Sequence, residues 1–209
     1  MKQNNNSFHR LVYGAVLAAL VCVVTFFRFP LLGSKVHFAN AMCLLSGLLM
    51  GPAAGGLAAG LGSALYDALW GGYDIIQCAI TFVSKFLMAW VCAKIAFAGD
   101  PQAKKHGWNI AACIIGALTY VALYMLKTFV YQKFVYGYPA DTVWATMLGK
   151  LPASMINAVA AMIAAPILYA ALRPALERAG QLAKIRNRDC AQNQKNAASE
   201  AGRGIFAPL

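Results

Sequence analysis

Lys85 is an ionisable residue inside a hydrophobic run, Ile75–Phe97. Gln77 and Thr81 precede it at intervals of four residues, so all three share one face if the run is helical. A charge in such apolar surroundings is costly and usually faces a bundle interior or a wet cavity. The alternative is that the amine reaches out to a polar interface. The spacing predicts a polar stripe that can bind a small solute.

A second stripe is carried by Lys150, Ser154 and Asn157 in the run Val143–Leu172. Lys150 follows Asp141 by only nine residues, so an interfacial position is a stronger alternative for it than for Lys85. Two such stripes facing each other would outline a pocket.

Acidic and aromatic side chains cluster near the ends of the same runs. Asp67 and Asp74 bracket a turn that contains Tyr73, where an acid can pair with Lys85, meet a ligand or pair at a helix end. Tyr124 and its aromatic neighbours fit an interfacial belt, and some of them could stack on a planar ligand.

Catalytic and metal-binding patterns are missing from the sequence. His9, His37 and His106 all lie outside the hydrophobic runs, so a serine inside a run has no histidine base. There is no GxxxxGK[ST] phosphate loop and no CxxC pair. We therefore predict no enzymatic activity, no cofactor and no metal site, and we expect any nucleotide-driven work to be done by a partner.

The composition indicates an integral membrane protein. Hydrophobic residues make up 60% of the 209 and charged residues only 12%, with a mean hydropathy of +0.58. Six runs are long enough or nearly long enough to be membrane helices. They are Leu11–Phe27, Phe38–Met50, Ala53–Trp70, Ile75–Phe97, Trp108–Leu126 and Val143–Leu172.

These runs predict an all-α fold, a bundle of six transmembrane helices. The expected divisions are an N-terminal segment at 1–10, a membrane domain at 11–172 and a basic, disordered tail at 173–209. The second run is too short to cross the bilayer upright, so either it is tilted and partly buried or its end at Gly51-Pro52 is misplaced.

Lys and Arg residues are distributed unevenly between the connections. Twelve lie on the side of the two termini and four on the opposite side, while Lys85 and Lys150 belong to neither. Basic residues accumulate on the cytoplasmic side. Both termini are therefore predicted to be cytoplasmic, in a multi-pass protein of the cell membrane.

Small residues at intervals of four mark the first run, notably Ala15 and Ala19. Such a stripe lets another helix approach closely. Spacing alone leaves open whether that helix belongs to this chain or to another subunit.

Several stretches resemble the substrate-binding S components of energy-coupling factor (ECF) transporters. They are NAMCLLSGLLMGPAAGG at 40–56, GLGSALYD at 60–67, ITFVSKFLM at 80–88, LPASMIN at 151–157 and APIL at 165–168, together with the AxxxA of Ala15 and Ala19.

The resemblance implies a six-helix bundle that binds a vitamin or precursor near its outer face, under a lid formed by Arg28–His37. It also implies docking of the Ala15 and Ala19 face onto a transmembrane coupling subunit that two cytoplasmic ATPases drive. The expected substrate-binding residues are Asn40, Asp67, Tyr73, Gln77, Thr81, Lys85, Tyr124, Lys150 and Asn157.

The identity of the vitamin stays open at this point, because proteins of one fold can differ in their pockets. A pocket containing Lys85 suits a planar or aliphatic ligand with one anionic or strongly accepting group. A stand-alone secondary transporter or channel for a small polar solute is the alternative function, although no internal repeat supports it.

Overall fold

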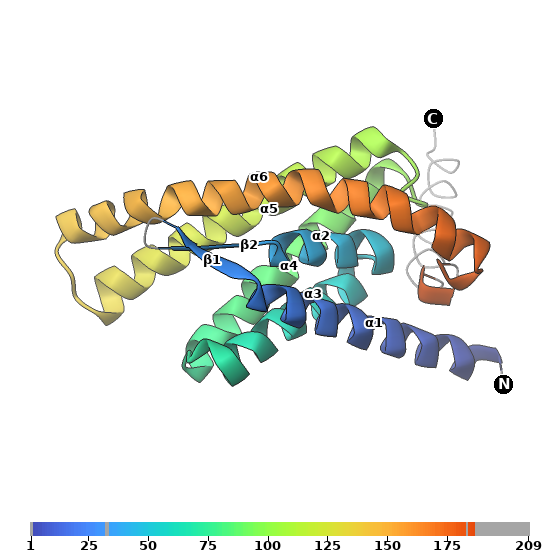
Figure 1. Cartoon of the computed structure of the whole chain (residues 1–209), viewed down its shortest axis with the longest axis horizontal. Coiled ribbons are helices and arrows are strands. Elements are labelled where there is room, and N and C mark those ends of the chain that lie inside the picture. Colours follow the sequence, from blue (N-terminus) through green and yellow to red (C-terminus); the bar gives the residue numbers. More distant parts are fainter. Residues whose placement is uncertain (1, 32–33, 183, 187–209) are drawn as a thin grey trace, which may run out of the picture.

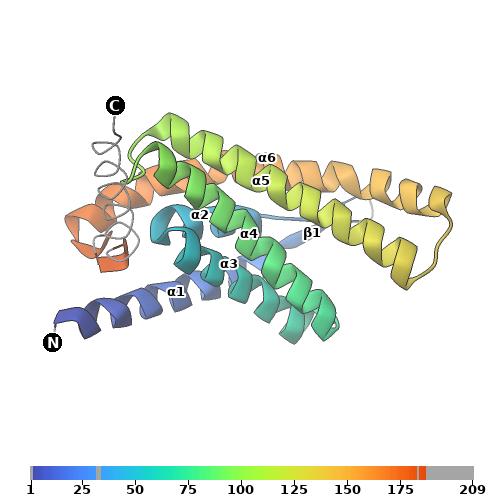
Figure 2. The same cartoon turned by 180° about the vertical axis from the view of Figure 1, so that it is seen from behind.

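Six α-helices account for most of the residues described by the structure, a computed structural model that covers 2–31, 34–182 and 184–186 (Figures 1 and 2). Their bounds are α1 Lys2–Phe26, α2 Ala39–Met50, α3 Pro52–Tyr66, α4 Ile75–Gly99, α5 His106–Val130 and α6 Ala140–Arg178. Two short π-helical turns, η1 Asp67–Gly71 and η2 Tyr131–Val135, extend α3 and α5.

Four of these helices are long and apolar enough to cross a membrane. The candidate spans are Ser7–Phe26, Ile75–Gly99, His106–Val135 and Ala140–Arg178. The helices α2 and α3 have 12 and 15 residues. At 1.5 Å of rise per residue, neither reaches across a hydrocarbon core of about 30 Å.

The short helix α2 occupies the centre of the bundle. It contacts every other helix, and Leu44, Leu45 and Leu48 on it are at most 1% exposed. It is apolar around nearly its whole circumference, which is typical of a helix buried on all sides. Of the two explanations for the short second run, the structure therefore favours a buried helix.

Gly51 separates α2 from α3 at the predicted boundary. Its φ of 86° lies in the left-handed region, which a glycine adopts without the steric cost that a side chain brings. Pro52 then occupies the first turn of α3, where no backbone N–H is needed. The Gly51-Pro52 break is thus confirmed.

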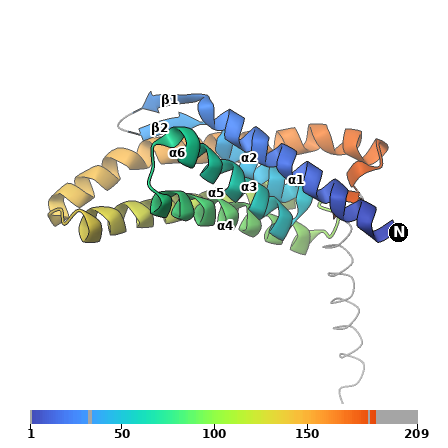
Figure 3. The ribbon, with the colours of Figure 1, turned by 90° about the horizontal axis from the view of Figure 1, so that it is seen from below.

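The connection between α1 and α2 is an antiparallel β-hairpin, which the all-α prediction did not include. Strand β1, Arg28–Leu31, pairs with β2, Ser34–His37, in the register Arg28↔His37 and Phe29↔Val36. Pairing satisfies backbone groups that an irregular loop would leave exposed beside an apolar bundle. Strand β2 packs against α6 (Figure 3).

Helices α3 and α4 form the most extensive helix pair, and glycine permits their close approach. A Cβ at Gly60 would lie 2.9 Å from the Phe82 ring, closer than side chains tolerate. This packing fixes the face of α4 that carries Lys85 relative to α3.

The chain beyond Leu172 differs from the expected tail. Helix α6 continues to Arg178, residues 179–180 form a turn, and 181–182 and 184–186 are again helical. Arg186 is only 6% exposed. Its guanidinium donates to the carbonyl oxygens of Leu48, Leu49 and Gln102 at 2.6, 3.1 and 2.8 Å. The rest of the predicted tail, 187–209, lies outside the described residues.

The physical reason for this difference is the end of α2. The last carbonyl groups of a helix have no partner within it. Arg186 supplies donors to two of them, at Leu48 and Leu49, and so the helical segment carrying it is packed on the bundle. A polar sequence alone does not reveal such a partner.

Candidate functional site

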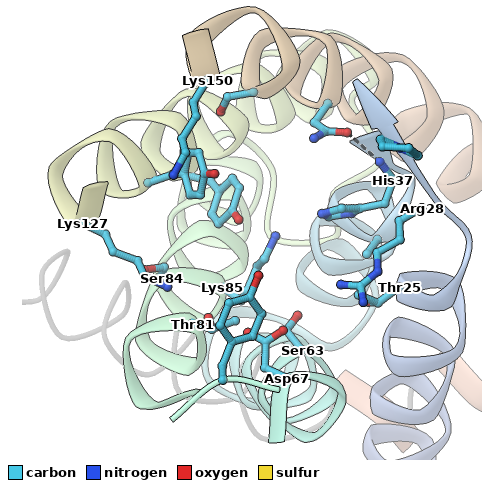
Figure 4. Close-up of a pocket in the computed structure, with 17 residues that line it drawn as sticks. Thr25, Arg28, His37, Ser63, Asp67, Thr81, Ser84, Lys85, Lys127 and Lys150 are labelled. Carbon is cyan, nitrogen blue, oxygen red and sulfur yellow. Dashed lines mark hydrogen bonds between the residues drawn. The ribbon is translucent and has the colours of Figure 1, made fainter. Parts of the chain in front are cut away.

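A cavity of about 520 Å³ opens between the hairpin and the helices (Figure 4). Its lining residues come from all six helices, the hairpin and the α3–α4 connection, mainly from the end of α1, the first half of α4, the last turns of α5 and the first half of α6. These segments lie at the end of the bundle away from the start of α1 (Figure 1). The lining includes four basic side chains, Arg28, Lys85, Lys127 and Lys150, and one acidic side chain, Asp67.

Lys85 on α4 is the most buried of the four cations, at 3% exposure. Its amine donates a hydrogen bond to the side-chain oxygen of Asn40 on α2. The amine also lies 3.6 Å from the centroid of the Tyr120 ring on α5. Both contacts favour a cation, but Lys85 forms no salt bridge with any residue that the structure describes. Figure 4 shows the amine directed into the cavity.

The Lys85 site therefore combines a buried amine with a neutral hydrogen-bond acceptor and a ring face, and none of the described residues supplies a counterion. Leaving a charge at this depth without an anionic partner is expensive. A ligand with an anionic or strongly accepting group can supply the stronger acceptor that the Lys85 amine does not find among the described residues.

His37 at the end of β2 joins the hairpin to the cavity. Its backbone N–H donates to the side-chain oxygen of Asn157 on α6 at 2.8 Å (dashed in Figure 4). Burial, with the positive charges of Lys85 and Arg28, lowers the pKa of His37 to about 3. The imidazole is therefore neutral at physiological pH.

Three buried polar atoms near this cavity have no hydrogen-bond partner among the residues that the structure describes. They are Nδ1 of His37, Nδ2 of Asn40 and Oγ of Ser154. Buried polar atoms in folded proteins are nearly always paired with protein or with water. These orphaned atoms offer a donor from Asn40 and donor or acceptor capacity from the imidazole and the hydroxyl.

Tyrosine rings form part of the wall. Tyr120 and Tyr124, one turn apart on α5, are stacked with centroids 6.2 Å apart. Lys127 lies 5.7 Å from the Tyr73 ring centroid, and Arg28 lies 4.8 Å from that of Tyr66. The wall can thus accept the face of a planar ligand as well as polar groups.

Most of the sequence-predicted site residues are brought together here. Seven line the cavity, namely Asp67, Tyr73, Thr81, Lys85, Tyr124, Lys150 and Asn157. Asn40 lies behind the lining and reaches it through its hydrogen bond to Lys85.

Gln77 does not line the cavity. Its backbone N–H and side-chain amide donate to the two carboxylate oxygens of Asp74, at 2.7 and 3.1 Å. Asp74 is the N-cap of α4, and these hydrogen bonds lower its pKa. Gln77 belongs to the first turn of α4, where capping decides the orientation of the side chain.

The sequence interpretation did not single out several residues that line the cavity. Arg28 and His37 were expected only as ends of a lid, and Lys127 was one of the four basic residues counted on the side opposite the termini. Thr25, Ser63, Ser84 and Tyr120 were not assigned to the pocket. The only signal in the sequence is the four-residue spacing of Tyr120 and Tyr124, which places both on one helix face.

Ala15 and Ala19 lie on the opposite side of α1 from its packed face. Both are exposed, whereas Leu17, Ala18 and Val21 are buried in the bundle. The AxxxA stripe is therefore not used for packing among the described helices.

Comparisons with known proteins agree with this architecture. Residues 5–174 match the family "ECF-type riboflavin transporter, S component". A solved structure described as "Structure and mechanism of the S component of a bacterial ECF transporter" is similar to the chain, with a TM-score of 0.59 and 22% sequence identity. The similarity covers 83% of this chain and 98% of that one, and it shows the same fold. The comparison with curated proteins found no match.

The family match extends over most of the chain and includes every element that surrounds the cavity. The protein therefore belongs to the family of ECF-type riboflavin transporter S components, which are integral membrane subunits that bind the substrate of an ECF transporter and are not enzymes.

Proposed function

We propose that this chain captures a vitamin or vitamin precursor in the cavity around Lys85, at the outer face of the cell membrane, and delivers it through the coupling subunit of an ATP-driven importer. Family membership implies a vitamin substrate and the partners of an ECF module. The observation that carries the proposal is the Lys85 amine, which is buried, directed into the cavity and without an anionic partner among the described residues.

Several residues are proposed to contact the substrate. Lys85 and Asn40 act as one unit, because Asn40 holds the amine and keeps its own Nδ2 available. The other proposed contacts are Asp67, Tyr73, Thr81, Tyr124, Lys150 and Asn157. Gln77 is proposed to act indirectly, because its hydrogen bond to Asp74 fixes the start of α4 beside the cavity.

The proposed topology has six membrane-spanning helices and both termini in the cytoplasm. It rests on the excess of Lys and Arg in the connections on the side of the termini. It also agrees with the cavity lying at the end of the bundle away from the N-terminus (Figure 1). Of the two short helices joined at Gly51, α2 is buried, whereas α3 exposes Leu57, Leu61 and Leu65 on one apolar face. Residues 1–10 and 173–209 then flank the membrane domain 11–172.

The exposed Ala15 and Ala19 face is proposed to dock on the transmembrane coupling subunit, which two cytoplasmic ATPases drive. Small side chains allow helix backbones to approach closely in a membrane. The nearby exposed residues Leu11, Val16 and Leu20 extend the same apolar face. Family membership favours this arrangement over a stand-alone secondary transporter or channel.

Riboflavin, the vitamin in the name of the family, is one compound that the cavity can be tested with. Its planar ring system suits the stacked Tyr120 and Tyr124 rings, and its carbonyl oxygens suit Lys85. The aliphatic, carboxylate-bearing pantothenate suits the basic lining equally well.

The test is equilibrium dialysis of the purified protein against a mixture of vitamins and precursors, with mass spectrometry of what is retained. We expect one compound to be retained stoichiometrically and without turnover. Loss of that retention in Lys85→Met would place the compound in this cavity, whereas unchanged retention would contradict the assignment.

A further inference from the structure

The charges around the cavity are unbalanced in a way that bears on the substrate. Arg28, Lys85, Lys127 and Lys150 line it, and Asp67 is the one acidic lining residue. His37 adds no charge, because its pKa of about 3 keeps it neutral. A single carboxylate can neutralise one of the four cations, so a strongly positive cavity remains.

Two of the cations line the cavity from α5 and α6. Lys127 stands in the last turn of α5, and Lys150 on α6 is close enough for the two charges to repel each other. Neither forms a salt bridge with a described residue. The Lys127 amine lies 5.7 and 6.0 Å from the ring centroids of Tyr73 and Tyr131, and the carboxylates of Asp67 and Asp74 attract it without forming a salt bridge.

These lysines are also separate from the Lys85 site. Lys85 is 3% exposed, whereas Lys127 and Lys150 are partly exposed, so they lie closer to the cavity opening. Figure 4 places Lys127 and Lys150 on neighbouring helices on the same side of the cavity. An oxyanion between them would relieve their mutual repulsion and accept hydrogen bonds from both.

We infer that Lys127 and Lys150 form an anion subsite, so that the substrate carries a carboxylate or phosphate at the cavity opening while its accepting group reaches Lys85. This inference rests on the proposed capture function and narrows its substrate class to anionic vitamins or precursors. It predicts that, between two compounds that differ only in that anionic group, the charged one binds more tightly.

The experiment uses two matched pairs in equilibrium dialysis with the purified full-length chain. Riboflavin and riboflavin 5′-phosphate form the planar pair, and pantothenol and pantothenate form the aliphatic pair. We expect the anionic member of at least one pair to bind about ten- to a hundred-fold more tightly than its neutral partner. The preference should weaken as salt concentration rises.

Variants locate the effect. Lys127→Gln and Lys150→Gln should each lower affinity for the anionic compound about ten-fold or more, a larger loss than the same variants show for its neutral partner. Lys133→Gln is the matched control, because Lys133 is an exposed cation in η2, just beyond α5, and does not line the cavity. It removes the same charge from the same end of the bundle.

The possible results of these experiments distinguish a failure of the anion subsite from a failure of the proposed substrate capture. Tighter binding of a neutral member, or equal loss in Lys133→Gln and Lys150→Gln, would overturn the anion subsite and leave substrate capture standing. Retention of none of the four compounds would overturn both the subsite and capture of these two vitamin classes.

Discussion

The Lys85 amine on α4 lies 3.6 Å from the centroid of the Tyr120 ring on α5. This contact and the hydrogen bond to Asn40 on α2 hold one cation between three helices. No acidic side chain among the described residues pairs with it. The arrangement stabilises the charged amine only in part, which leaves a strong site for a ligand acceptor.

Replacing Lys85 by Met tests that site. The change keeps an unbranched side chain of similar length and removes the charge, so we expect substrate affinity to fall about a hundred-fold. The fold should stay intact, because removing an unpaired buried charge relieves its desolvation cost. Isothermal titration calorimetry measures the first effect and thermal unfolding in detergent the second.

Lys94→Met is the matched control for Lys85→Met, since Lys94 is an exposed lysine on the same helix. It should leave affinity unchanged. Equal affinities in Lys85→Met and the native protein would remove Lys85 from the binding site.

A tryptophan at Ala15 should separate substrate binding from transport. The exposed AxxxA face lies away from the cavity lining, so affinity in detergent should change less than about two-fold. A bulky side chain there keeps another helix from approaching closely, and uptake by cells carrying the whole importer should fall at least about ten-fold.

Ile114→Trp controls for the added bulk, because Ile114 is an exposed apolar residue on α5. We expect it to spare uptake. Normal uptake by Ala15→Trp would show that this face is not the docking surface.

His37 should make the stability of the protein depend on pH. Its folded-state pKa of about 3 lies below the ordinary 6.5, so the unfolded chain takes up a proton first as pH falls. Stability is then lost progressively below pH 6.5, by about 2 kcal/mol at pH 5. The His37→Gln variant should lack this part of the loss.

Chemical denaturation in detergent at pH about 7.5 and about 5 measures the difference. His106→Gln provides the comparison, because His106 is exposed at the start of α5. If His37→Gln and the native protein lose the same stability on acidification, the imidazole is not buried as described.

Residues that share one helix were predictable from spacing. The four-residue interval of Thr81 and Lys85 placed both on one face of α4, and both line the cavity. Gln77 continues the interval, yet hydrogen bonding to the N-cap Asp74 turns its side chain away. Helical periodicity therefore predicted which side chains reach the cavity from the interior of α4, but not from its first turn.

Residues that depend on long-range pairing were not predictable in this way. His37 reaches the cavity only because β2 pairs with β1 and its backbone bonds to Asn157, 120 residues away. Strands of four residues are too short for a periodic signal. Arg186 looked like part of a polar tail, although its partners are carbonyl groups at the end of α2.

Arg186 is expected to hold the end of α2 opposite the cavity. In Arg186→Met the carbonyl groups of Leu48 and Leu49 lose their donor, and the guanidinium no longer stacks on the Phe97 ring at 4.9 Å. We expect a loss of about 2–4 kcal/mol in unfolding free energy, because charge-assisted hydrogen bonds are lost and buried acceptors stay unpaired. Substrate affinity should stay within about two-fold, since these residues do not line the cavity. Chemical denaturation in detergent gives the first quantity and calorimetry the second.

Arg178→Met removes an exposed arginine from the last turn of α6 and should cost less than about 0.5 kcal/mol. Equal stabilities of the two variants would show that the segment carrying Arg186 does not support the bundle.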